Sequence, residues 1–153
     1  MAIAVVLGTA SWCLNPSTGR AQGPNEACTL LSKADAAAAL GEAAQGPKET
    51  GPMSAGAGGT VSACAYTGSG LNRIQLNLTR LAASSVPMYK GLCAKQSNVG
   101  LAGLGDVACW YNDKHGELHV IKGTAFVSIE FQWTGDPTEP IKAVMKKAIA
   151  KLK

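Results

Sequence analysis

Four cysteines are distributed through the body of this chain, and they constrain its fold more than any other feature. Cys28, Cys64, Cys93 and Cys109 are separated by long intervals, whereas a fifth, Cys13, lies in an apolar stretch near the N-terminus. An even number of cysteines in a body of this size is typical of disulfide-bonded proteins from oxidising compartments. We therefore expect two disulfides and a location outside the cytoplasm.

The N-terminal stretch has the pattern of a secretory leader. Residues 2–14 are mostly apolar, but the run is shorter than the ~20 residues that a membrane-spanning helix needs. Pro16 and a small-residue cleavage site follow, so we predict a signal peptide over residues 1–21 and no transmembrane segment. The alternative is a buried core segment. Lipidation of Cys13 is disfavoured because Trp12 precedes it.

The length and charge of the remaining body limit its organisation and its partners. Removal of the leader leaves 132 of the 153 residues, which is the size of one domain with one hydrophobic core. The formal net charge falls from +4 to +3 when Arg20 is lost, and this balance is too weakly basic to indicate a nucleic-acid partner. We predict a single domain over residues 22–153 that is monomeric and holds no cofactor.

The first part of the body combines a capped helix with a segment that is poor in apolar residues. Ser32 and Asp35 form a capping-box pattern, and Gly41 suits the left-handed position that ends a helix, so we predict a helix over residues 33–40. Residues 42–60 are rich in glycine and proline and have little to bury, which predicts a flexible loop. Their glycines lack the lysine and hydroxyl pair of a phosphate-binding loop.

The middle of the chain alternates between apolar and polar residues. This pattern predicts two paired antiparallel strands over residues 61–66 and 73–79. A helix is predicted next, capped by Ser84 or Ser85, because apolar side chains recur at helical spacing after Pro87.

The last third predicts three further strands and a final helix. Residues 107–111, 118–122 and 124–133 are the strands, and the last of them has a long apolar face. The helix is predicted to begin at Asp136 and Pro137 and to be amphipathic, as expected for a helix that lies on a sheet. The complete prediction is an α+β fold in the order α-β-β-α-β-β-β-α, with an antiparallel sheet of about five strands and three helices.

Four cysteines allow three disulfide pairings, and sequence alone does not choose among them. We favour Cys28 with Cys64 and Cys93 with Cys109. The first bridge would fasten the first helix to the first strand across the glycine-rich segment, and the second would fasten the second helix to the next strand. Each bridge is expected to stabilise the fold by about 2–5 kcal/mol.

Three short motifs occur together with the C-terminal amphipathic helix. They are residues 28–35 followed by Ala39-Leu40-Gly41, the strand motif Cys64-Ala65-Tyr66 and the loop Gly103-Leu104-Gly105-Asp106. With these motifs the chain resembles a group of small exported bacterial proteins and lipoproteins of unknown function. The resemblance covers most of the body and implies an α+β domain with a Cys28–Cys64 bridge, a periplasmic or cell-surface location and no established enzymatic activity. Because the motifs are structural, they indicate a fold more than a function.

One segment concentrates the residue types that bind metals. Asp113, His115, Glu117 and His119 are spaced by two, so one continuous strand would place all four on the same face, where they could bind a transition metal. The alternative is a hairpin turn over residues 112–116, which would leave both histidines as exposed polar side chains. A metal site with His115, Glu117 and His119 is the second functional hypothesis.

Aromatic and basic side chains supply two further candidates. Tyr66, Trp110, Phe126 and Trp133 could line a ligand groove if they emerge together on the less hydrophobic face of the sheet, although such aromatics are more often part of the core. The final helix has a basic polar side that could contact an anionic surface, although a solvated face is the commoner outcome. Its lysines are Lys142, Lys146, Lys147 and Lys151.

The sequence carries no recognisable catalytic motif. It has no serine in a G-x-S-x-G turn, and a cysteine nucleophile would have to be one of the four that we expect to be bridged. We therefore expect no enzymatic activity. The leading hypothesis is an exported, periplasmic or surface, binding module for an envelope component, a small ligand or a protein partner. The alternative is a metal-binding or enzymatic protein that uses His115 and His119.

Overall fold

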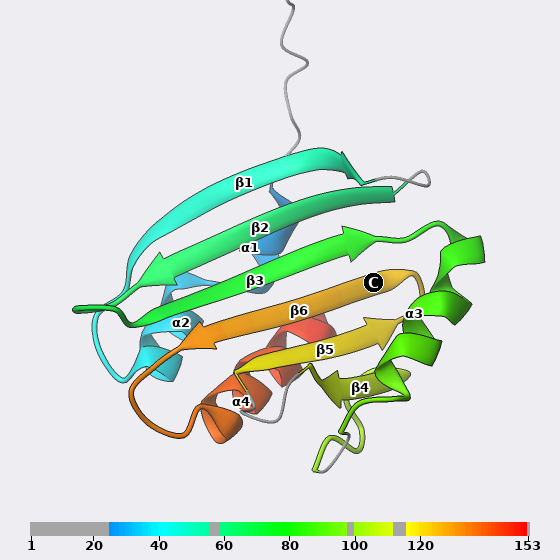
Figure 1. The fold of residues 1–153 in the computed structure, drawn as a ribbon. Helices are drawn as coiled ribbons and strands as arrows, with labels where there is room; N and C mark the ends of the chain where they lie inside the picture. The colour runs from blue at the N-terminus through cyan, green and yellow to red at the C-terminus, as the bar shows by residue number, and fades with distance from the viewer. Residues whose placement is uncertain (1–24, 56–58, 98–99, 112–115, 153) are drawn as a thin grey trace, which may run out of the picture.

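The chain folds into one antiparallel β-sheet with helices packed against it, an α+β arrangement stabilised by two disulfides (Figure 1). This computed structural model describes residues 25–55, 59–97, 100–111 and 116–152. The predicted signal peptide and His115 lie outside these ranges. Within them, no helix combines the length and the apolar composition that a membrane crossing requires.

The sheet has six strands in the order β1-β2-β3-β6-β5-β4, and every neighbouring pair is antiparallel. The strands are β1 (Gln45–Ala55), β2 (Gly59–Thr67), β3 (Arg73–Arg80), β4 (Val107–Trp110), β5 (Glu117–Lys122) and β6 (Ala125–Gln132). The helices in the described ranges are α1 (Glu26–Leu30), α2 (Lys33–Leu40), the short 3-10 helix η1 (Ala83–Ser85), α3 (Val86–Cys93) and α4 (Thr138–Lys151). The sheet thus has one strand more than the sequence predicted, and α1 is an additional helix.

Strict alternation along the central strands divides the sheet into two faces. Leu76 of β3 is in register with Ile129 of β6, and Ile129 is in register with Leu118 of β5. All three side chains are fully buried. On the opposite face β3 carries polar side chains such as Gln75 and Asn77, whereas Phe126 of β6 and Ile121 of β5 form an apolar pair there. This confirms the alternation that the sequence predicted for β3 and β6.

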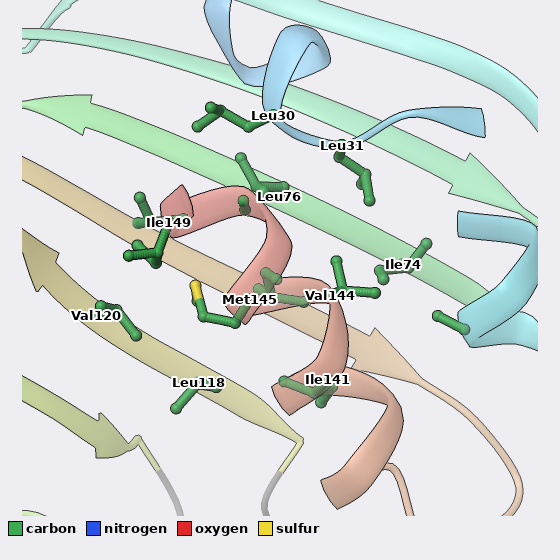
Figure 2. Packing of buried hydrophobic residues seen from close by; sticks show 14 of the residues in the cluster. Leu30, Leu31, Ile74, Leu76, Leu118, Val120, Ile141, Val144, Met145 and Ile149 are labelled. Atoms are coloured by element: carbon green, nitrogen blue, oxygen red, sulfur yellow. The ribbon is translucent and has the colours of Figure 1, made fainter. Parts of the chain in front are cut away.

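Helices α1, α2 and α4 cover the apolar face and enclose the hydrophobic core (Figure 1). Figure 2 shows Ile141, Val144, Met145 and Ile149 of α4 lying over β3, β6 and β5, with Leu30 and Leu31 beside them. These α4 positions follow the spacing of an amphipathic helix, and the prediction that the final helix packs on a sheet face is confirmed.

Helix α2 begins and ends where the sequence predicted. The Ser32 hydroxyl oxygen accepts a hydrogen bond from the amide of Asp35 at 3.1 Å and donates one to the Asp35 carboxylate at 2.6 Å. Gly41 ends the helix with a φ of 68°, a left-handed conformation that glycine adopts without steric penalty.

An ion-pair cluster joins α2 to α4. The Asp35 carboxylate lies 2.9 Å from the ammonium of Lys147 and 3.3 Å from that of Lys151. Burial disfavours the charged carboxylate, but the hydrogen bond from Ser32 and the two ammonium groups outweigh it and hold the pKa of Asp35 well below its usual range. The cluster therefore stabilises the helical layer when Asp35 is ionised.

Strand β1 corrects the prediction of a loop over residues 42–60. It forms the edge of the sheet and pairs only with β2, and most of its side chains are exposed. Backbone hydrogen bonds hold such a strand without an apolar face, so the sequence pattern did not reveal it. Irregularities in the register accommodate Gly46-Pro47 and Gly51-Pro52.

Helix α1 was also missed, because its support comes from distant parts of the chain. The Asn25 side chain accepts a hydrogen bond from the amide of Cys28 and caps the helix. The same side chain donates to the carbonyl oxygens of Thr50 in β1 and Ala63 in β2, at 3.1 and 3.0 Å. Cys28 is bonded to Cys64 in β2. A five-residue helix has no periodic signal of its own, and these tertiary contacts fix its position.

Candidate ligand-binding site

Helix α3 lies on the sheet face opposite α1, α2 and α4. Its last residue, Cys93, is bonded to Cys109 of β4, and this is the second bridge that we favoured from the sequence. Cys109 is in register with His119, which is in register with Ser128, and this row lies on the side away from the core. Figure 1 shows α3 beside the β4 end of the sheet.

A hollow of about 410 Å³ lies between α3 and the sheet. Its walls are formed by Tyr89 and Leu92 of α3, by the Cys93–Cys109 disulfide and by the rings of Tyr111, His119 and Phe126. Lys95 and Gln96, which follow α3, complete its rim and are exposed. We call this feature the α3 hollow. Its lining is mostly apolar, in contrast to the polar surface of β3 and β6 beside it.

Four rings form a continuous series along the α3 hollow. The centroid of the His119 ring lies 4.8 Å from that of Tyr111 and 5.0 Å from that of Phe126. The ring of Phe126 in turn lies 5.0 Å from that of Tyr89. These distances are in the range of favourable aromatic contacts, which contribute about 0.5–1.5 kcal/mol each beyond area burial. The rings therefore present a preformed aromatic surface.

Glu117 holds the central ring of this series in place. Its Oε1 lies 2.7 Å from Nε2 of His119, and both side chains are largely buried, with exposed fractions of 23% and 15%. Residues spaced by two on β5 lie on the same face, so the sheet itself brings them together. The contact uses the Nε2 atom of His119 and fixes the orientation of its imidazole between Tyr111 and Phe126.

The predicted metal site is only partly described. Glu117 and His119 lie together, whereas Asp113 and His115 fall outside the described residues. Within the described residues, no group of three or more histidine, cysteine or acidic side chains could hold a metal ion. The metal site therefore stays a prediction.

The structure does not bring the four predicted groove aromatics together. Tyr66 and Trp110 belong to the hydrophobic core, with exposed fractions of 4% and 1%. Trp133 packs against the core from its edge, and its ring lies 5.8 Å from that of Phe131. Phe126 alone of the four lines the α3 hollow. The predicted groove is thus corrected, because strand alternation turns Tyr66 and Trp110 to the helix-covered face.

Tyr89, Leu92 and Tyr111 line the hollow but were not predicted as site residues from the sequence. Leu92 is 56% exposed on α3, and Met88, one turn before it, is 59% exposed. Tyr111, beyond the end of β4, is 55% exposed. Large apolar side chains that stay in solvent around a hollow are a signal of an interaction site.

The opposite end of the open face is polar and internally paired. The Asn77 amide nitrogen donates to Ser128 at 3.1 Å and to Glu130 at 3.0 Å, and Gln75 donates to Asn77 at 2.7 Å. A second hollow, of about 310 Å³, borders Arg73 and Glu130. These hydrogen bonds satisfy the polar groups within the protein.

The lysines of α4 are largely engaged by the protein itself. Lys142 pairs with Glu139 at 2.8 Å, and Lys147 and Lys151 both pair with Asp35. Lys151 also donates to the carbonyl oxygen of Leu30 at 2.9 Å. Lys146 is exposed. The carboxylates of Glu139 and Asp35 thus offset much of the positive charge on this helix.

The motifs that carry the sequence resemblance cap a helix, form a disulfide and make a tight turn. The resemblance itself stays a prediction. Ser32 caps α2 and Cys64 is bridged. Gly105, with a φ of +60°, approaches β5 so closely that a Cβ atom would lie 2.5 Å from the carbonyl oxygen of Ile121. Asp106 then accepts a hydrogen bond from the amide of Gly123 at 3.1 Å.

Comparison of the chain with protein families, curated proteins and solved structures yields no match.

Proposed function

We propose that this protein is an exported binding module that holds a small ligand with an apolar body in the α3 hollow. The observation that carries the proposal is a preformed hollow of about 410 Å³ lined by four aromatic rings. Ligand sites are concave, mostly apolar and of about 300–1,000 Å³. Met88, Leu92 and Tyr111 add exposed apolar area at the hollow or close to it, and binding would remove this area from water.

A binding role is favoured over catalysis by the state of the reactive groups around the hollow. Cys93 and Cys109 are bonded to each other, so neither sulfur is available as a nucleophile. The Nε2 atom of His119 is engaged by the Glu117 carboxylate. The rest of the lining is aromatic and aliphatic surface with Lys95 and Gln96 at the rim, an arrangement suited to holding a ligand.

Export is favoured by the two disulfides and by the leader in the sequence. Peptide mapping of the secreted protein under non-reducing conditions tests this part of the proposal. The expected result is an N-terminus at Gln22 and no free thiol among the four bridged cysteines. A cytoplasmic protein with reduced cysteines would contradict it.

Binding in the α3 hollow is tested with 2-naphthol, a neutral ring compound, by fluorescence titration of the intact protein. We expect saturable binding that Leu92→Ala weakens about three- to tenfold, because about 1 kcal/mol of apolar contact is lost. Leu71 is 79% exposed on a distant turn, so Leu71→Ala is the matched control and should leave binding unchanged. Equal effects of the two variants would contradict the site.

The second candidate is metal binding near His119, and the contact between Glu117 and His119 is the observation that favours it. Calorimetric titration with zinc, copper and nickel salts tests it. A metal site is supported if binding is stoichiometric and if both His115→Ala and His119→Ala abolish it. The absence of any heat of binding would contradict a metal site.

A further inference from the structure

We infer that the ligand of the α3 hollow is a small organic anion with a flat ring body and one carboxylate-like group. This inference rests on the proposed function and adds the chemical class of the ligand. It follows from two features of the hollow: an aromatic interior, and the rim residue Lys95, which has no ion-pair partner among the described residues.

The interior selects a flat apolar body. The ring centroids of Tyr89 and Phe126, and those of Phe126 and His119, lie 5.0 Å apart. A planar ring inserted against them makes the offset and edge-on contacts that aromatic groups prefer. The rings are held by the sheet, by the Cys93–Cys109 bridge and by Glu117, so little ordering is needed on binding.

The rim supplies a positive charge. Lys95 lines the hollow directly after α3, and its side chain makes no ion pair with any of the described residues. Lys90 on the preceding turn differs, because its ammonium lies 3.1 Å from the Asp106 carboxylate. An anionic group of a ligand at the mouth of the hollow would give Lys95 the ion-pair partner that it lacks among the described residues.

Among the described residues, Glu117 and Asp106 are two acidic groups on this side of the sheet, and both are already engaged. Glu117 is engaged by His119 and borders the neighbouring polar hollow, and Asp106 is engaged by Lys90 and by the amide of Gly123. A cationic ligand would meet Lys95 as a like charge. A ring compound that carries an anion therefore fits both the interior and the rim.

The experiment compares four probes on the intact, disulfide-bonded protein by calorimetry: 2-naphthoate, 2-naphthol, 2-naphthylmethylammonium and octanoate. We expect 2-naphthoate to bind about fivefold more tightly than 2-naphthol, which is the gain typical of an exposed ion pair. The ammonium compound should bind more weakly than 2-naphthol. Octanoate should bind more weakly than 2-naphthoate, because its chain makes no ring contacts.

Two lysine variants separate the charge of Lys95 from general electrostatics. Lys95→Gln should reduce 2-naphthoate binding to the level of 2-naphthol and leave 2-naphthol unchanged. Lys33→Gln, at the exposed start of α2 on the other side of the sheet, removes the same charge and should change neither affinity. Both residues are exposed, so the variants are expected to fold.

The outcomes distinguish the inference from the proposed function. Failure of all four probes to bind would overturn the binding site itself. Equal affinities for 2-naphthoate and 2-naphthylmethylammonium, or equal effects of the two lysine variants, would overturn the anionic ligand and leave the site intact. Tighter binding of octanoate than of 2-naphthoate would overturn the ring body.

Discussion

Each disulfide joins a helix to one face of the sheet, but the two helices are attached in different ways. Cys28 of α1 is bonded to Cys64 inside a large hydrophobic core that α2 and α4 also enclose. Cys93 of α3 is bonded to Cys109 on the other face, and it is the only buried residue of its helix. The core side is stabilised by packing, whereas α3 depends on its bridge and on few side-chain contacts.

This contrast separates stability from binding. A face that packs tightly leaves no room for a ligand, because protein interiors approach the density of organic crystals. The α3 side keeps a hollow because its helix exposes Met88 and Leu92 and reaches the sheet mainly through Tyr89 and the disulfide. We therefore expect changes on the two faces to have different consequences, which three measurements of stability can test.

The largest difference is expected for a leucine on each face. Leu76 is fully buried at the centre of the core, so Leu76→Ala should lower the free energy of unfolding by about 2–5 kcal/mol. Leu92 is 56% exposed on α3, so Leu92→Ala should change it by less than about 0.5 kcal/mol. Urea denaturation measures both values. Comparable losses would show that α3 belongs to the same packed unit as the core.

Removal of each disulfide should come next in size. The bridges span 36 and 16 residues, so loss of Cys28–Cys64 should cost more than loss of Cys93–Cys109, within about 2–5 kcal/mol for each. Paired cysteine-to-alanine variants and denaturation measure the costs.

The local effects of these variants sharpen the contrast. Without the Cys93–Cys109 bridge, the amides of α3 should exchange hydrogen much faster, and those of α4 should keep their protection. Loss of protection in α4 to the same extent as in α3 would contradict independent attachment of the two layers.

The smallest expected effect concerns the Asp35 cluster on the core side. The folded-state pKa of Asp35 lies below its unfolded value of about 3.9, so its contribution is complete at neutral pH and is lost as pH falls below about 4. Asp35→Asn should lower the free energy of unfolding at pH 7 by about 1–2 kcal/mol and make its acid dependence shallower. Urea denaturation between pH 2 and pH 7 measures this, and identical pH profiles would contradict it.

Local signals in the sequence were enough for the elements that depend on their own residues. Ser32 and Gly41 mark the ends of α2, and alternation through Ile129 marks β6. The favoured cysteine pairing also agrees with the structure. The signals for α2 and β6 lie within the residues of each element. The cysteine pairing follows from the order of the elements along the chain.

Tertiary contacts decided the elements and site residues that the sequence did not reveal. β1 is held by backbone pairing with β2, and α1 by Asn25 and its bridge. Tyr89, Tyr111 and Phe126 are far apart in sequence and meet only because β6, β5 and β4 are neighbours and α3 is bonded to β4. Alternation alone does not bring residues of different strands to one hollow.

The claim that the less packed face holds the ligand is tested most directly by NMR with bound 2-naphthol. We predict intermolecular NOEs from the naphthol ring protons to the rings of Tyr89 and Phe126 and to the methyl groups of Leu92. NOEs to Arg73 and Gln75 at the polar hollow, or to side chains of α4 on the core side, would contradict it.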